Sequence, residues 1–320
     1  MTDSGVTQAS RSPIEAVLAD ELARGDVVLG TIGPMLGMLL ANHDHALFSD
    51  EIVARVRSMA ASVARQMLVA EGAAAGEDDP YAFAAERGEP LADALIENLS
   101  LLGHCHALAL EYRLAIQLEA RNSIDPVLSP LLQSLIAAPD EATSQLAMAL
   151  LAAQSRFVQQ QRRMELAIVE LSPGLFEFAL DRWREHGGGS GDNAVAQAES
   201  RLRQNYEAHD GRLSLLARAA GAVGEGMQPA MSLGHAGVGL FLTAIALAAR
   251  QDRDLIAIST NESQLARFAL AARAAGLKPG QIAEQFALVH PHVTLPDGFD
   301  TLRADRATAI LDASGHPALD

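Results

Sequence analysis

The sequence predicts an all-α protein. Alanine and leucine are abundant, and aromatic residues make up only 4% of the 320 residues, a composition typical of helices. No strict alternation of apolar and polar residues extends beyond a few positions, whereas apolar spacings of three and four recur. We therefore expect ten to twelve helices and no significant sheet, arranged as a multi-helix bundle or as an irregular array of helical hairpins.

The first half of the chain contains four long candidate helices. An apolar segment over 27–43 comes first, and Ser49 is expected to cap the next helix, because its hydroxyl precedes Asp50 and Glu51; acidic residues there face the positive end of the helix dipole. The further predicted helices cover 48–71, 90–121 and 140–171.

The start and stop signals are clearest in the middle of the chain. Ser172 is a capping hydroxyl before Pro173 at the first helical position, and the helix that follows is expected to end at Gly187 in a left-handed conformation. A further helix is predicted over 193–223.

Three more helices are predicted toward the C-terminus. The first covers the apolar part of 226–249. Asn261 and Gln264 have the spacing of a capping box, that helix is expected to stop at Gly276, and Pro279 opens the last one.

The glycine-rich run 187–192 is the clearest candidate boundary, since consecutive glycines form flexible connectors. We expect a disordered tail over 1–12, a helical domain over 13–186, a linker or loop over 187–192, and a second helical domain over 193–320. A HEAT-like stack of helix pairs is a physical alternative to a compact bundle, although no repeat signature supports it.

Charge and cysteine content limit the classes of partner. The 24 basic and 40 acidic residues give a net charge of −16, which disfavours nucleic acid as a partner because phosphate binding needs a basic face. Cys105 is the only cysteine, so an internal disulfide is impossible, and we expect a reducing, cytoplasmic location. The segment 226–249 is expected to be a buried core helix, because only its last 12 residues are densely apolar. Insertion of this segment in a membrane is the alternative.

Several histidines invite a metal hypothesis, but none of the usual helical spacings is present. No glutamate stands three residues before a histidine, and His-Glu-x-x-His is missing. His290-Pro291-His292 is interpreted as a surface turn, with a metal pair as the alternative. Any helical metal site would need ligands from several helices. The candidates are His43, His45, His104, His106, Glu97 and Glu111.

Two further segments contain candidate binding residues. Asn205 and His209 fall on the apolar seam of the helix predicted over 193–223, with Tyr206 beside them, where they would fix helix register or face a partner chain. His235 lies among glycines such as Gly234 and Gly237, where another backbone or a ligand can approach closely. We favour a packed histidine at a tight helix crossing, with a pocket in which the imidazole acts as acid or base as the alternative.

These observations favour a non-catalytic helical module that acts through apolar helix faces on a protein partner or on a second copy of itself. The alternative is a helical enzyme that depends on a metal or cofactor held by histidine and glutamate from several helices. The sequence favours no particular cofactor, and neither a Gly-x-Ser-x-Gly nor a Walker A motif is present.

Overall fold

The computed structural model describes residues 13–41, 50–206 and 211–315, and this part of the chain contains helices and no strand. The all-α prediction is confirmed. The described residues form α1 (Pro13–Ala41), α2 (Asp50–Ala75), α3 (Pro80–Ile96), α4 (Leu99–Asn122), α5 (Pro130–Ile136), α6 (Glu141–Arg162), α7 (Pro173–His186), α8 (Asp192–Asn205), α9 (Arg212–Ala222), α10 (Leu233–Ala249), α11 (Arg253–Ser259), α12 (Leu265–Ala274), α13 (Pro279–Val289) and α14 (Ala304–Asp312). Four 3-10 turns join them, namely η1 (Ile168–Glu170), η2 (Glu225–Met231), η3 (Glu262–Gln264) and η4 (Phe299–Thr301).

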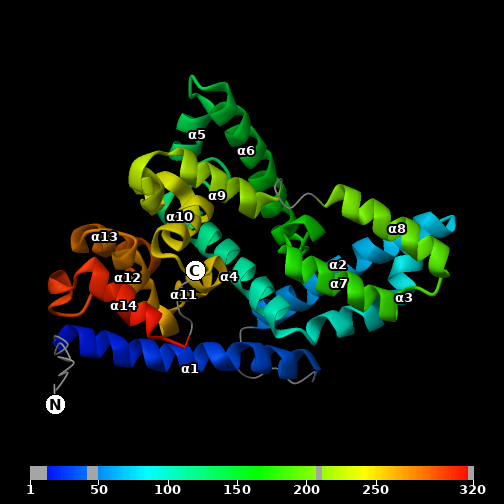
Figure 1. Ribbon diagram of the computed structural model, residues 1–320, viewed down its shortest axis with the longest axis horizontal. Coiled ribbons are helices and arrows are strands. Elements are labelled where there is room, and N and C mark those ends of the chain that lie inside the picture. The colour runs from blue at the N-terminus through cyan, green and yellow to red at the C-terminus, as the bar shows by residue number, and fades with distance from the viewer. Residues whose placement is uncertain (1–12, 42–49, 207–210, 316–320) are drawn as a thin grey trace, which may run out of the picture.

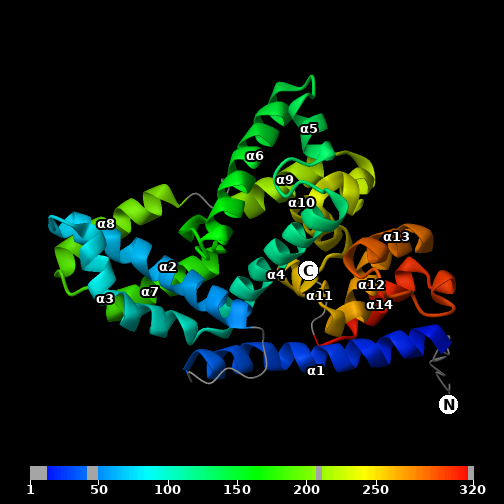
Figure 2. The same ribbon diagram turned by 180° about the vertical axis from the view of Figure 1, so that it is seen from behind.

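Helix α4 runs through the centre of the molecule, with α1 on one side and α10 on the other (Figure 1). It contacts α1, α2, α3, α6, α10, α11 and α13. Helices α2, α3, α7 and α8 form an arm on one side, and the α5–α6 hairpin projects from the body (Figure 2). Helix α1 contacts α12 and α14 near the other end of the sequence. This long-range packing differs from a HEAT-like stack, in which each unit contacts its sequence neighbours.

Several predicted helix ends are confirmed. The Ser172 hydroxyl accepts a hydrogen bond from the backbone N–H of Leu175, and α7 begins at Pro173. Gly276 has a left-handed backbone with φ +96° after α12, and α13 begins at Pro279. The predicted capping role of Ser49 lies outside the described residues.

Three predicted helices are shorter than expected, which raises the helix number to fourteen in the described chain. The helix predicted over 90–121 is broken at Glu97 and Asn98, where the Asn98 side chain caps α4 by accepting from the backbone N–H of Leu101. The helix predicted over 140–171 ends at Arg162, and that over 193–223 divides into α8 and α9. At the first of these breaks, the Asn98 side-chain cap overrides helix propensity.

The glycine-rich loop 187–192 is fixed by one buried carboxylate. Glu71 accepts from the indole Nε1 of Trp183 at 2.8 Å and from the backbone N–H groups of Gly188 and Ser190 at 2.9 and 3.1 Å. Gly187 has φ −65°, so the left-handed stop predicted there is wrong. After the loop, α8 packs against α2, so the segments before and after 187–192 belong to the same arm. The division into two domains stays a prediction.

Helix α10 is buried along most of its length. No single helix of the described chain is long and apolar enough to cross a membrane; α10 and α11 reach that threshold only as a pair, which is bent by 117°. Gly237 interrupts α10 with φ +73°, and a Cβ added there would lie 3.2 Å from the Cβ of Ser129. The interruption of α10 at position 237 thus requires glycine, because of both its backbone conformation and the lack of space for a side chain.

We expect Gly237→Ala to lower the free energy of unfolding by about 1–3 kcal/mol, because it forces an L-residue into a left-handed conformation beside Ser129. Urea denaturation measures the change. Gly103→Ala is the matched control, since a Cβ at this position of α4 meets nothing within 4 Å, and it should leave stability unchanged or raise it by about 0.5–1 kcal/mol. Equal effects of the two substitutions would contradict the role of Gly237.

Candidate functional site

A buried cluster of charges joins four segments that are distant in the sequence. The Arg212 side chain is 0% exposed; its Nη1 lies 2.8 Å from Glu111 Oε1 and its Nε lies 3.1 Å from Glu170 Oε2. Arg253 Nη2 lies 3.0 Å from Glu111 Oε2. The Arg212 guanidinium also lies over the ring of Phe157, 3.5 Å from its centroid. The cluster connects α4, η1, α9 and α11.

The charges in this cluster balance one another. Burial opposes ionisation of Glu111, yet Arg212 and Arg253 outweigh it and lower the pKa of this carboxyl to about 2. Two arginines thus face the two carboxylates of Glu111 and Glu170. Because a buried ion needs such compensation, the cluster holds the helices in place rather than presenting a free acid or base.

His104 is occupied in the same way. Its Nδ1 lies 2.7 Å from Asp254 Oδ2, and its Nε2 lies 3.0 Å from the backbone oxygen of Glu170. Burial opposes its charge, but Asp254 and Glu170 raise the pKa of the imidazole above its ordinary value of 6.5. With both ring nitrogens bonded, His104 has no lone pair left for a metal.

The other described candidates do not complete a metal site. His106 is buried, and burial together with Arg113 lowers its pKa to about 4. Glu97 is exposed beyond the end of α3, and Glu111 is engaged by two arginines. No group of three potential ligands that could hold a metal is found in the described ranges. His104, His106, Glu97 and Glu111 are therefore not brought together as one ligand group in the described ranges. The metal alternative stays a prediction, and His43 and His45 lie outside the described residues.

His104, His106 and Glu111 are all buried in α4, each at most 4% exposed. Burial raises the pKa of the neighbouring Cys105 thiol to about 12, so Cys105 is a thiol at neutral pH and a poor nucleophile.

The seam predicted for Asn205 and Tyr206 is not formed as expected. Asn205 is the last residue of α8 and is exposed, because the helix does not continue to α9. Tyr206 is partly buried; its ring stacks on Phe176 with centroids 3.8 Å apart, and its hydroxyl donates to the backbone oxygen of Leu171. His209 lies outside the described residues, and a role of this segment in partner binding stays a prediction.

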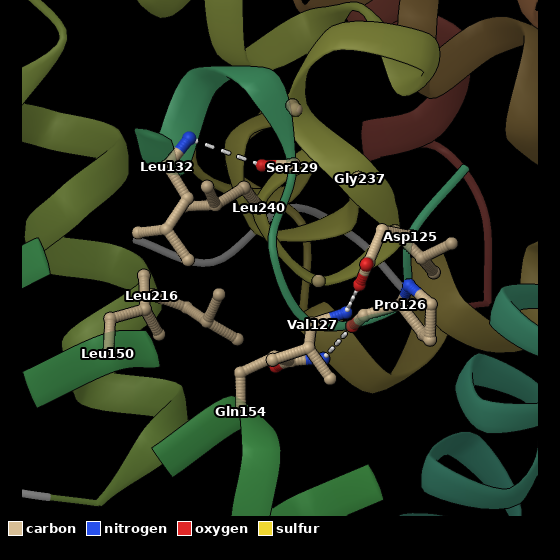
Figure 3. A pocket seen from close by; sticks show the side chains of 13 residues that line it. Asp125, Pro126, Val127, Ser129, Leu132, Leu150, Gln154, Leu216, Gly237 and Leu240 are labelled. Atoms are coloured by element: carbon tan, nitrogen blue, oxygen red, sulfur yellow. Dashed lines mark hydrogen bonds between the residues drawn. The ribbon is translucent and has the colours of Figure 1, made fainter. Parts of the chain in front are cut away.

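The pocket predicted around His235 is small. Gly237 lines a hollow of about 20 Å³ with Asp125, Ser129 and Gln154, whereas Gly234 and His235 are not in its wall. In Figure 3 these polar side chains hydrogen-bond to nearby backbone, including Gln154 to the oxygen of Pro126 at 2.9 Å. The hollow has room for about one water molecule and is too small for an organic ligand.

A larger apolar groove lies along α1, and we call it the α1 groove. Its volume is about 250 Å³. Leu18 and Phe286 are among its apolar lining residues, Val17 is 50% exposed at its edge, and Glu21 and Glu262 are the acidic residues of its wall. The other lining residues are Ser263, Leu265, Ala266, Ala269, Val293, Thr294, Leu295 and Pro296.

The sequence-based interpretation missed Arg212, Arg253 and Asp254. A signal for Arg212 exists, because Arg212, Leu215, Leu216 and Ala219 are spaced as one helix face. An arginine on such an apolar face indicates a buried ion pair. Nothing in the sequence, however, identifies Glu111 and Glu170 as its partners.

We expect Arg212→Ala to lower the free energy of unfolding by about 3–5 kcal/mol, because it leaves Glu111 and Glu170 buried without their shared counter-ion. Denaturant titration provides the measurement. As control, Arg303→Ala removes a pair with Asp305 whose side chains are 77% and 61% exposed, and should change stability by about 0.5 kcal/mol or less. A loss as small as the control's would show that the cluster does not support the fold.

The His104–Asp254 pair should make stability depend on pH. Because the folded-state pKa of His104 is raised, its contribution is fully present below the unfolded-state pKa of about 6.5 and is lost as the pH rises through the folded-state value. Urea denaturation of the native protein and of Asp254→Asn should therefore show a stability difference that is largest near pH 6 and shrinks at higher pH. The pKa of His106 is lowered, so its contribution to stability has the opposite pH dependence. This contribution is the same in both proteins and cancels in the difference. A difference that grows with pH would contradict the assignment.

Comparison of the chain with protein-family models, with curated proteins and with solved structures finds no match.

Proposed function

We propose that the protein is a non-catalytic interaction or regulatory module that binds a basic amphipathic segment of a partner protein in the α1 groove. The observation that carries this proposal is the groove itself, with its apolar lining and the half-exposed Val17 at its edge. An amphipathic helix places an apolar face into such a groove and keeps its polar face in solvent.

The charge of the partner segment follows from the acidic surroundings. Glu21 and Glu262 are the only charged residues that line the α1 groove in the described chain, and the protein carries a net charge of −16. Lysine or arginine beside the apolar face of the partner would complement these carboxylates and accelerate association. A second copy of this chain fits less well, because two chains of the same high charge repel each other.

The internal bonding of the polar side chains supports a non-catalytic role. Glu111, Glu170, Arg212 and His104 are all bonded to one another or to neighbouring groups, so their charges stabilise the fold. In the described ranges, no three His, Cys, Asp or Glu side chains lie together as metal ligands would, so the metal-dependent enzyme has less support.

A short helical peptide of leucine and lysine tests the proposal, with a leucine and glutamate peptide as its counterpart. Fluorescence anisotropy should show saturable binding of the basic peptide, weakened by salt, and no binding of the acidic one. Val17→Arg should weaken binding by about tenfold or more, or about 1.4 kcal/mol, because it places a positive charge at the apolar edge.

The matched control is Val27→Arg. Val27 lies on the same helix, is 69% exposed and does not line the α1 groove. Its substitution should leave peptide affinity unchanged. Equal losses in the two variants, or equal binding of the two peptides, would overturn the proposed function.

A further inference from the structure

A second hollow, which we call the arginine pocket, lies beside α4 where α13 ends. Its volume is about 420 Å³. Helix α4 contributes Arg113, Gln117 and Arg121 to its wall, and the segment after α13 contributes His290 and His292. Apart from Glu262, the charged lining residues are thus arginines, in a protein of net charge −16.

The fixed charge of this pocket is positive. Arg113 and Arg121 face a single carboxylate among the lining residues, that of Glu262. Arg113 forms no ion pair or hydrogen bond with another described residue, and Arg121 donates one bond, from Nη2 to the backbone oxygen of Leu288 at 3.0 Å. Both guanidinium groups therefore keep donors that can bind a carboxylate or phosphate in a bidentate manner.

His290 supplies the second kind of contact. Only 9% of this residue is exposed, so the surface turn predicted at His290-Pro291-His292 is wrong for its first histidine. The imidazole bonds the backbone of Thr260, and its Nε2 is buried without a hydrogen-bond partner. Burial lowers the pKa of His290, so the ring is neutral at neutral pH and one nitrogen accepts a hydrogen bond.

We propose that the arginine pocket binds a small organic anion that also carries a hydroxyl group. Arg113 and Arg121 hold its acidic group, and the hydroxyl donates to Nε2 of His290, which satisfies the buried nitrogen. Leu114, Val289 and Val293 provide the apolar part of the wall. This site differs from the α1 groove in charge and in ligand class, and it does not depend on the proposed function.

Glycerol 3-phosphate is the probe, because it combines a phosphate with hydroxyl groups. Isothermal titration of the full chain should show saturable binding of glycerol 3-phosphate. Inorganic phosphate, an anion without a hydroxyl on carbon, should bind more weakly, and glycerol should not bind. Arg113→Gln and Arg121→Gln should each weaken glycerol 3-phosphate binding by about tenfold. His290→Phe should reduce the preference for glycerol 3-phosphate over inorganic phosphate.

Arg156→Gln is the control, since Arg156 is exposed on α6 and does not line the pocket, and it should bind the probe as the native protein does. Arg113→Gln removes no described bond and should fold normally, which circular dichroism verifies. Absence of saturable binding, or binding that Arg113→Gln and Arg121→Gln leave unchanged, overturns the proposal.

Glu262 separates this proposal from the proposed function, because it lines both hollows. Glu262→Gln should tighten glycerol 3-phosphate binding, since it removes the one negative charge of the arginine pocket, and should weaken binding of the basic peptide to the α1 groove. If the peptide response fails and the anion response holds, only the proposed function is overturned. The reverse result overturns only the arginine pocket.

Discussion

The compensation of buried charge around Arg212 is the constraint on which the rest of the structure depends. A fully buried guanidinium is tolerated only where carboxylates surround it, and Glu111 and Glu170 supply them from α4 and η1. The same cluster reaches α11 through Arg253 and lies next to the His104–Asp254 pair. These bonds fix the position of α4 relative to the helices that pack around it (Figure 1).

The central position of α4 explains why so many polar side chains in this protein are buried and bonded. Between Leu101 and Glu111, α4 is covered on nearly all sides, so the histidines and the glutamate of this stretch find partners within the protein. Their pKa values then move with the partner: Arg212 and Arg253 lower that of Glu111, and Asp254 raises that of His104. Groups that resemble metal ligands in the sequence thus act as structural ion pairs.

The two hollows at the surface of the body have opposite character. The α1 groove is apolar with acidic residues in its wall, whereas the arginine pocket is polar and positively charged, and Glu262 lies in both. This shared carboxylate would couple the two sites electrostatically. An anion in the arginine pocket and a basic segment in the α1 groove would both interact with the charge of Glu262.

The sequence by itself determined the helical class and those helix ends that depend on neighbouring residues, such as Ser172 with Pro173 before α7 and Gly276 after α12. Capping and backbone conformation are local, so a short stretch of sequence suffices to predict them. Only the tertiary structure decided which side chains meet. Arg212 reaches Glu111 across 101 positions and His104 reaches Asp254 across 150, and pairing over such separations depends on how the helices pack, which helical periodicity does not encode.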